Sequence, residues 1–377
     1  MSLGARISAE LRGDRAIWAI VLILSLFSVL AVYSSTGTLA YRVNGGNTES
    51  YLFKHALIIV GGLLFTYMSY LLHYMRFNRW APYLVLFSIP MLTYTVFFGA
   101  DINDARRWIE VPFIGITFQT SDFAKLALIT YIARMISARQ DYIKDFNSTF
   151  VPIIVPVLLI CGLIAPADLS TAILLFITSL IMMFIGRVDT RYILLLLFLG
   201  VVVFSFLVTI GRFFPDFVRV DTWTSRVSDF VESPEGGYQI QQAKIAIANG
   251  NIFGLGPGNS IQRNFLPSPY ADFIYAIICE EYGIFGGFAI ILLYLFLFFR
   301  VTRLITKSPK AFGAMLVMGL SVSLILQAFT NIAVSLHLVP VTGITLPLVS
   351  MGGTSVLFTC ISFGMILSVS KYIESLE

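Results

Sequence analysis

Charged side chains are scarce in this sequence, at 12% of its 377 residues, whereas 57% of the residues are hydrophobic. A soluble globular domain has about 25% charged residues, so this composition excludes an ordinary soluble protein. The net charge is only +4 and the basic residues are spread along the chain, which gives nucleic-acid binding little support. Long apolar runs are present instead, and they predict a polytopic membrane protein.

Cysteine is scarce, with three residues, and internal repeats and long linkers are absent from the sequence. Cys161, Cys279 and Cys360 lie far apart in apolar runs, which predicts small core residues and no disulfide framework or metal cluster. The glycine-rich segment 254–258 lacks the Lys-Ser/Thr ending of a P-loop, which argues against nucleotide binding and favours a turn. With no repeat of fixed period and no long Ser- or Pro-rich linker, residues 1–377 are predicted to form one membrane domain.

Ten stretches are apolar over about the 20 residues that a membrane-spanning helix needs, so the predicted fold class is all-α. The first is too long for the core of a secretory signal and is predicted to be retained. The fifth and sixth meet at a break around 166–168 and are predicted to form a hairpin. The predicted spans are residues 16–35, 53–73, 80–98, 121–138, 149–165, 168–186, 190–210, 271–299, 311–335 and 346–370.

The positions of Lys and Arg predict the orientation of these spans. If the N-terminus is cytoplasmic, most of the 25 basic residues lie on the cytoplasmic side, and the short loops opposite contain only Arg42, Lys54, Arg106 and Arg107. This is the bias of the positive-inside rule. Both termini are therefore predicted to be cytoplasmic, and the loops at 99–120 and 211–270 to face the outside.

The long outer loop between the seventh and eighth spans, residues 211–270, holds most of the mass outside the membrane. A stripe of Ile240, Ala243 and Ile247 predicts a short helix over 238–248 that ends at Asn249-Gly250. A loop of this length is usually functional or disordered. Its aromatic and aliphatic residues predict that it folds back onto the membrane domain.

Several polar side chains within or beside the spans have a structural interpretation. Asp122 and Lys125 are three residues apart at a helix start and are predicted to pair, either as a salt bridge or at a site. Asp168 lies between two spans, where capping a helix is favoured over catalysis. Gln327 and Asn331 are four residues apart in the ninth span, where hydrogen bonds between helices explain them.

Outward-facing arginines form a second group. Arg106 and Arg107 stand beside Trp108, which fits an interfacial anchor because Trp belongs to the aromatic belt. Arginines in a short outer loop run against the orientation bias, however, so anion binding is an equal alternative. Arg226 and Arg263 lie in the long outer loop and are candidates for the same role.

Asp272 is the candidate on which the functional interpretation depends. Ser268 is predicted to cap the eighth span and Pro269 suits its first position, which puts Asp272 in the first turn. An acid at the mouth of a membrane helix marks a working site by default, although stabilisation of the helix dipole is the alternative. On an ideal helix Glu280 and Glu281 point to different faces, so both cannot serve one site.

Five blocks in the same order resemble the FtsW/RodA family, the polytopic proteins of bacterial shape, elongation, division and sporulation. The blocks are Ala105-Arg106-Arg107-Trp108-Ile109, Ser121-Asp122-Phe123-Ala124-Lys125, Gly254-Leu255-Gly256 to Asp272-Phe273-Ile274, Glu280-Glu281-Tyr282-Gly283, and Asn331 with Pro340-Val341-Thr342-Gly343-Ile344-Thr345-Leu346-Pro347 and Ser350-Met351-Gly352-Gly353-Thr354-Ser355. The resemblance spans nearly the whole chain. The run 258–262 resembles the division branch, FtsW, more than the elongation branch, RodA.

Three short stretches depart from the family pattern. The family usually has Pro-Ser-Glu, His-Thr and Pro-Asp-x-Gly-Thr where this chain has Thr120-Ser121-Asp122, Tyr270-Ala271 and Ala167-Asp168-Leu169-Ser170-Thr171. The change at Tyr270 removes a titratable neighbour of Asp272, so a mechanism that relies on that histidine is in doubt. Asp272, Lys125, Arg107 and Trp108 are unchanged from the family pattern.

The resemblance implies a peptidoglycan glycosyltransferase that polymerises lipid II during septal cell-wall synthesis in cell division. It would work at the outer face of a bacterial cytoplasmic (inner) membrane without a nucleotide. Its partners would be lipid II, the growing glycan strand, a class B penicillin-binding protein that acts as a transpeptidase, and other division proteins. The alternatives are a RodA-type elongation enzyme, a lipid II flippase without chemistry, or a scaffold for the transpeptidase.

For this activity, Asp272 is the predicted catalytic base, and Mg²⁺ or another divalent cation held by Asp272 is the alternative role. Substrate binding is assigned to Arg106, Arg107, Trp108, Asp122, Lys125, Arg226 and Arg263, and supporting roles to Asp168, Glu281, Gln327 and Asn331.

Overall fold

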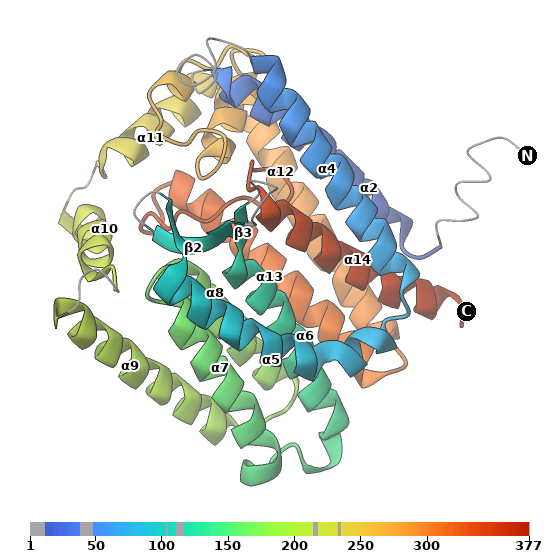
Figure 1. Cartoon of the computed structure of the whole chain (residues 1–377). Helices are drawn as coiled ribbons and strands as arrows, with labels where there is room; N and C mark the ends of the chain where they lie inside the picture. The colour runs from blue at the N-terminus through green and yellow to red at the C-terminus, as the bar shows by residue number, and fades with distance from the viewer. Residues whose placement is uncertain are drawn as a thin grey trace, which may run out of the picture. The chain divides into compact units, whose positions relative to one another are not determined.

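Each of the ten predicted spans contains a helix in the computed structural model, which describes residues 12–37, 48–102, 105–110, 117–213, 218–232 and 235–376, without the side chains of 101–102 and 105–106. The spans correspond to α2 (Arg15–Ser35), α4 (Thr48–Leu71), α5 (Met75–Phe98), α6 (Thr120–Ala138), α7 (Val151–Ile164), α8 (Leu169–Ile185), α9 (Thr190–Phe213), α12 (Ile274–Lys307), α13 (Ala311–Ser335) and α14 (Thr354–Glu374) (Figure 1). A short π-helical segment, Phe146–Phe150, leads into α7.

Eight helical segments among the described residues are long and apolar enough to cross a membrane, which confirms a multi-pass helical membrane protein. α8 is apolar but shorter. α6, which carries Asp122, Lys125 and Arg134, is not among the eight. Ten crossings and the orientation therefore stay predictions.

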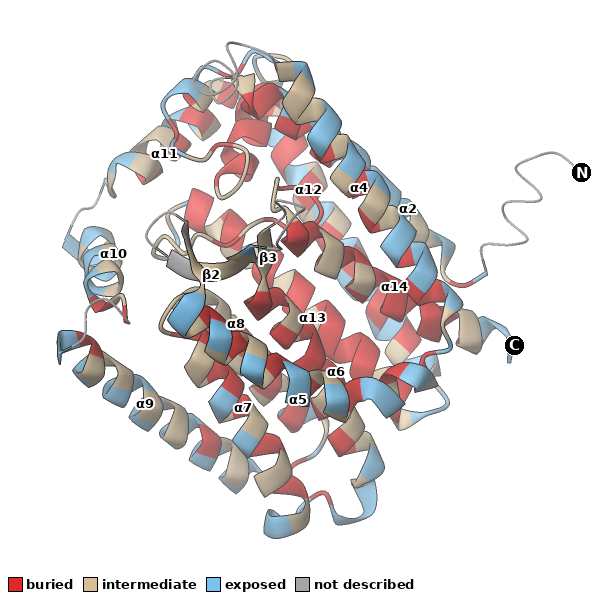
Figure 2. Cartoon of the chain, viewed as in Figure 1, coloured by how far each residue is buried: buried red, intermediate tan, exposed pale blue. Residues whose placement is uncertain are grey.

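The exposed faces of these helices are apolar, as a lipid environment requires. Only 6% of an 18-residue apolar stretch of α9 is buried, against 72% of the corresponding stretch in α13 and 78% in α14 (Figure 2). The large side chains of Leu194, Phe198 and Phe206 are exposed along α9. Polar groups such as Ser28 and His55 are instead buried, and they hydrogen-bond to each other at 2.8 Å. This arrangement inverts that of a soluble protein.

The backbone contacts divide the chain into two compact units. Unit 1 contains residues 1–69, 225–300 and 324–367, and unit 2 contains residues 70–224, 301–323 and 368–377. The prediction of a single membrane domain stays a prediction.

In unit 1, the predicted helix in the long outer loop is confirmed as α11 (Tyr238–Gly250). Its apolar stripe packs on the start of α12 and the end of α13, which confirms that this part of the loop folds back. The buried cluster contains Ile240, Ala243, Ala246, Leu266, Phe273, Ala276, Ile277 and Val334, with Ile247 packed against it.

In unit 2, α7 and α8 form the predicted hairpin, separated by a turn at 165–168. The loop between α5 and α6 contains a three-stranded antiparallel sheet that the sequence did not predict. It is built from β1 (Ala100–Ile102), β2 (Ala105–Glu110) and β3 (Thr117–Gln119), with Trp108 paired to Gln119. A second unpredicted element, α10 (Val220–Glu232), lies in the long outer loop, and its residues from 225 onward belong to unit 1.

α4 and α5 each begin about five residues earlier than predicted, and two other helices begin later than predicted. The tenth span was predicted from residue 346, but α14 begins at Thr354, and Leu348 adopts a left-handed backbone with φ of 61°. The eighth span was predicted from residue 271, but α12 begins at Ile274 and is kinked at Gly283, whose backbone is not helical (φ of 66°). Asp272 therefore precedes the helix and is not in its first turn. In both places backbone groups are hydrogen-bonded to other segments, which competes with helix formation.

Candidate functional site

Asp272 lies at the junction between the long outer loop and α12, and its side chain is partly exposed. Three consecutive carbonyl groups fix the backbone here. The Tyr270 carbonyl accepts the Met351 N–H at 2.9 Å, the Ala271 carbonyl accepts the Ser350 hydroxyl at 2.6 Å, and the Asp272 carbonyl accepts the Asn331 amide at 2.8 Å. We name this arrangement the 270–272 clamp. These hydrogen bonds fix the backbone at Asp272, while the residue itself stays partly exposed.

Asn331 is the central donor of the clamp. Its amide nitrogen also donates to the Ile344 carbonyl at 2.7 Å, and its side chain is 1% exposed. Gln327, one turn earlier, donates to the Thr345 carbonyl at 3.0 Å. The prediction that these two amides bond between helices is wrong, because their acceptors lie in the non-helical backbone around 272 and 344–345.

The Asp272 carboxylate faces Gly343, which adopts a left-handed backbone with φ of 71°. A Cβ at Gly343 would lie 3.8 Å from Oδ2 of Asp272 and 4.0 Å from Nη2 of Arg226. Glycine is therefore favoured by its conformation, and a Cβ would make only ordinary contacts with the two charged groups. Arg226, on α10, also donates to the Thr342 carbonyl at 3.3 Å. The structure thus brings Arg226 and Asp272 to the same short loop.

Tyr270 occupies the position where the family usually has histidine. Burial, followed by the charges of Asp272 and Tyr51, raises the pKa of Tyr270 above its ordinary value of 10.0. The phenol is therefore protonated at neutral pH, where it is able to donate a hydrogen bond but not to act as a base.

Glu280 and Glu281 are both fully buried, and both hold the segment 255–262. Glu280 accepts the Ser260 hydroxyl and the N–H of Gln262 at 3.2 Å. Glu281 accepts the Ser34 hydroxyl and the Ser260 N–H at 3.4 Å. Both carboxylates therefore hold the loop, and the prediction that the two glutamates cannot both serve the site of Asp272 stays a prediction.

The glycines of this loop allow that close approach. Gly254 adopts φ of 78°, and a Cβ there would overlap the backbone carbonyl of Glu281. The N–H groups of Leu255 and Gly256 bond to the carbonyls of Glu280 and Glu281 at 2.9 and 3.0 Å. The predicted turn in this segment is confirmed, and its glycines also serve packing against α12.

Arg263 donates from Nη1 to the Ser34 carbonyl at 2.8 Å, which ties the long outer loop to the end of α2. This contact gives it a structural partner in unit 1, and its predicted role in binding diphosphate stays a prediction.

In unit 2, the predicted pair is confirmed: Nζ of Lys125 lies 3.2 Å from Oδ1 of Asp122. Asp168 caps α8, as predicted, by accepting the Thr171 N–H at 3.1 Å, and it pairs with Arg107 at 2.9 Å. A cavity beside Arg107 and Asp168 measures about 20 Å³, which is room for about one water molecule. Because Asp168 is the carboxylate partner of Arg107, the role of Arg107 toward substrate stays a prediction.

Two further predicted residues complete this set. Trp108 lies in β2, and its side chain is partly exposed. The side chain of Arg106 lies outside the described residues. Sequence reasoning gave no separate role to Ser350 and Gly343, although both lie in the blocks 340–347 and 350–355 that carry the family resemblance.

Comparison with known proteins places these features in a family. The model of the cell cycle protein family FtsW/RodA/SpoVE matches residues 14–375. The chain is 32% identical over 362 residues to the probable peptidoglycan glycosyltransferase FtsW of Haemophilus influenzae, covering 94% of this chain and 90% of that protein. It is 31% identical over 368 residues to stage V sporulation protein E of Bacillus subtilis, covering 95% and 97%.

The fold also matches a solved structure, in which a peptidoglycan synthase complex coordinates polymerization and crosslinking. The TM-score is 0.71 at 22% identity, over 96% of this chain and 98% of the other. Since the family model and the curated relatives both cover almost the full length, this chain belongs to the FtsW/RodA/SpoVE family of cell cycle proteins.

Proposed function

We propose that this protein is a peptidoglycan glycosyltransferase that polymerises lipid II during septal cell-wall synthesis. Relatives at about 31–32% identity over nearly the full length are named probable peptidoglycan glycosyltransferase FtsW. The observation that carries the proposal in this chain is Asp272, whose backbone is held by the 270–272 clamp while its carboxylate stays accessible beside Arg226.

The reaction joins an α-linked lipid-diphosphate donor to an acceptor sugar and gives a β-1,4 bond. This inversion requires one base and no covalent intermediate. Asp272 takes the proton from the acceptor hydroxyl as the new C–O bond forms, and the diphosphate leaves with the electron pair of the broken bond. A diphosphate needs no general acid if cations neutralise its charge. Arg226 is the basic group that contacts the same loop as Asp272.

A divalent cation is an alternative source of that neutralisation. In the described part of the chain, no three His, Cys, Asp or Glu side chains form a group that could hold a metal. Mg²⁺, however, is commonly bound by one or two carboxylates together with substrate phosphates. Asp272 fits that donor set only when a diphosphate is present, and the ion would then neutralise the leaving group.

The proposed topology has ten crossings and two cytoplasmic termini, and it puts residues 211–270 and Asp272 outside the cytoplasmic membrane. α6 and α8 would cross with the eight more apolar helical segments. The many basic residues of the predicted cytoplasmic loops support this orientation. A donor with its own diphosphate supplies the energy of bond formation where nucleotides are absent.

The proposed partner is a class B penicillin-binding protein that crosslinks the strands made here. The similar fold of a peptidoglycan synthase complex that coordinates polymerization and crosslinking supports this pairing. A flippase is less well supported, because the Gln327 and Asn331 amides that would line a polar route donate to backbone carbonyls.

The test uses the purified full chain with labelled lipid II, with and without the transpeptidase. We expect glycan chains from the wild type and loss by at least about 100-fold in Asp272→Ala, since general base catalysis contributes roughly 10²–10⁴-fold. Asp221→Ala, an exposed acid on α10, is the matched control. Wild-type rates in folded Asp272→Ala would remove the assignment. Movement of lipid II between leaflets without polymer would indicate a flippase. The absence of both polymer and lipid movement would indicate a scaffold.

A further inference from the structure

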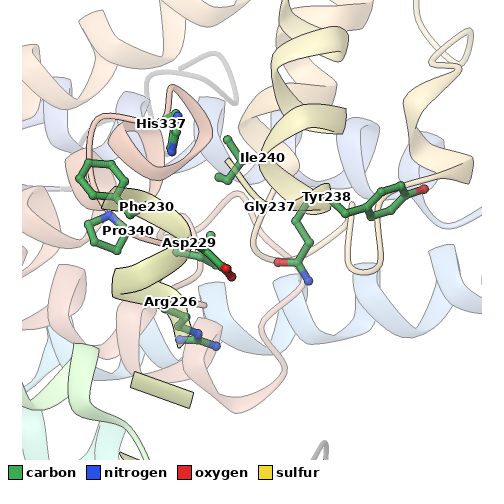
Figure 3. A pocket seen from close by; sticks show the side chains of 10 residues that line it. Arg226, Asp229, Phe230, Gly237, Tyr238, Ile240, His337 and Pro340 are labelled. Atoms are coloured by element: carbon green, nitrogen blue, oxygen red, sulfur yellow. The ribbon is translucent and has the colours of Figure 1, made fainter. Parts of the chain in front are cut away.

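A pocket of about 250 Å³ in unit 1 lies between α10, the start of α11 and the segment that follows α13 (Figure 3). Pockets that enclose a whole small molecule measure about 300–1,000 Å³. This volume therefore suits one unit of a larger ligand, with the remainder of the ligand outside the pocket.

Hydrogen-bonding groups and apolar surfaces alternate around the pocket. Arg226 and Asp229 are three residues apart on α10 and share a face of that helix. In Figure 3 the Asp229 carboxylate is directed into the space between α10 and the start of α11. The rings of Phe230 and His337 meet edge to face at 5.2 Å between centroids, and Val341 contributes an aliphatic surface.

The charges in the pocket nearly cancel. Burial, followed by the charge of Lys244 on α11, lowers the pKa of His337 below its ordinary value of 6.5, so this imidazole is neutral at pH 7. One guanidinium and one carboxylate remain, from Arg226 and Asp229. Asp229 would repel a diphosphate, which disfavours an anion as the occupant. An uncharged ligand with several hydroxyl groups and an apolar face matches the lining: the carboxylate accepts from hydroxyls, and the guanidinium donates to hydroxyl oxygens.

Arg226 links the pocket to the site of Asp272. Arg226 lines the pocket and donates to the Thr342 carbonyl, and its Nη2 atom lies beside Gly343 together with the Asp272 carboxylate. We propose that the pocket is a saccharide subsite, which holds the sugar next to the one whose hydroxyl Asp272 deprotonates. The subsite rests on the proposed function, and its occupant is an uncharged sugar unit of the substrate.

The test measures binding of N,N′-diacetylchitobiose, a neutral disaccharide without peptide or diphosphate, to the full chain in detergent by saturation-transfer NMR. We expect saturation transfer in the wild type, and roughly tenfold weaker binding in Asp229→Asn, because a charged hydrogen-bond acceptor is replaced by a weaker neutral one. Gln239→Ala, a second change in the lining, is expected to weaken binding too. Asp221→Asn on the same helix, outside the pocket, is the matched control and is expected to bind as the wild type does.

Chitobiose binding that is unchanged in both pocket variants, or absent in the wild type, would overturn the subsite. So would competition by inorganic pyrophosphate, which would make the pocket an anion site, or binding of a peptidoglycan stem peptide in its place. Lipid II polymerisation is measured on the same preparations. Polymerisation without chitobiose binding refutes the subsite alone. Specific chitobiose binding without polymerisation supports a saccharide site and refutes the proposed function.

Discussion

Asp272 and Glu281 are nine residues apart, and their surroundings assign them different roles. Glu281 is 1% exposed, and its carboxylate accepts the Ser34 hydroxyl and the Ser260 N–H. A buried carboxylate is tolerated only with such partners, and removing one partner is costly. Asp272 is held through its backbone and keeps its side chain partly exposed. Access therefore distinguishes the candidate base from the acid that supports the loop.

His337 gives a pH-dependent prediction at the scale of one residue. Its pKa in the folded protein is lowered, first by burial and second by Lys244. The unfolded chain therefore binds a proton more readily than the folded one near pH 6.5 and just below. The contribution of neutral His337 to folding stability is fully present above its pKa in the unfolded chain, about 6.5. This contribution is lost as the pH falls through the lower pKa of His337 in the folded protein.

The measurement is thermal unfolding of the wild type and His337→Asn between pH 8 and pH 5. Asn is chosen because His337 has φ of 57°, a conformation that Asn tolerates. The wild type is expected to lose more of its Tm below pH 6.5 than the variant does. Parallel curves over the whole range would contradict this prediction.

At the scale of elements, α13 and the loop 340–353 act together on the start of α12. Asn331 on α13 bonds both the Asp272 and Ile344 carbonyls, while Ser350 bonds the Ala271 carbonyl and accepts the Leu346 N–H at 2.8 Å. These contacts explain why helices α12 and α14 both start later than apolar periodicity predicts. Their first predicted turns are replaced by a tertiary hydrogen-bond network around Asp272.

Asn331→Leu, which keeps the size of the side chain and removes its donors, tests this network. Two carbonyls lose a partner, which costs roughly 1–3 kcal/mol of stability for each buried group left unsatisfied. We expect kcat for lipid II polymerisation to fall by about 100-fold, because a misplacement of about 1 Å has an effect of that size. KM should change little, because Asn331 donates to backbone carbonyls.

Initial rates against lipid II concentration measure this separation of kcat from KM. Asn147→Ala, at an exposed asparagine before α7, is the control for handling and folding. A variant that raises KM while keeping kcat would show that Asn331 serves substrate binding and does not position Asp272.

At the scale of the whole molecule, the exposed apolar faces of the helices require a membrane, and the distribution of charge predicts its sides. Cys161, Cys279 and Cys360 are all free and buried, so the wild type provides a low labelling background. Asn259 lies exposed in the long outer loop, and Ser375 lies exposed near the C-terminus. These positions report on opposite sides of the proposed topology.

In intact cells, a membrane-impermeant maleimide is expected to label Asn259→Cys and to leave Ser375→Cys unlabelled until the cells are permeabilised. The wild type is the control for the buried cysteines. Labelling of Ser375→Cys in intact cells, or protection of Asn259→Cys there, would contradict the predicted orientation and the outer location of Asp272.

The sequence by itself determined those features of the fold that depend on the length of apolar runs, on helical periodicity and on pairing between nearby residues. The helical membrane fold, α11, the α7–α8 hairpin, the Asp168 cap and the Asp122–Lys125 pair all depend on residues near one another in the chain. Only the tertiary structure decided what depends on distant partners. The partners of Glu280 and Glu281, the late start of α12, the 270–272 clamp and the pocket beside Arg226 belong to this second group. Each is formed by backbone groups or side chains brought together from separate segments, and local periodicity carries no information about those distances.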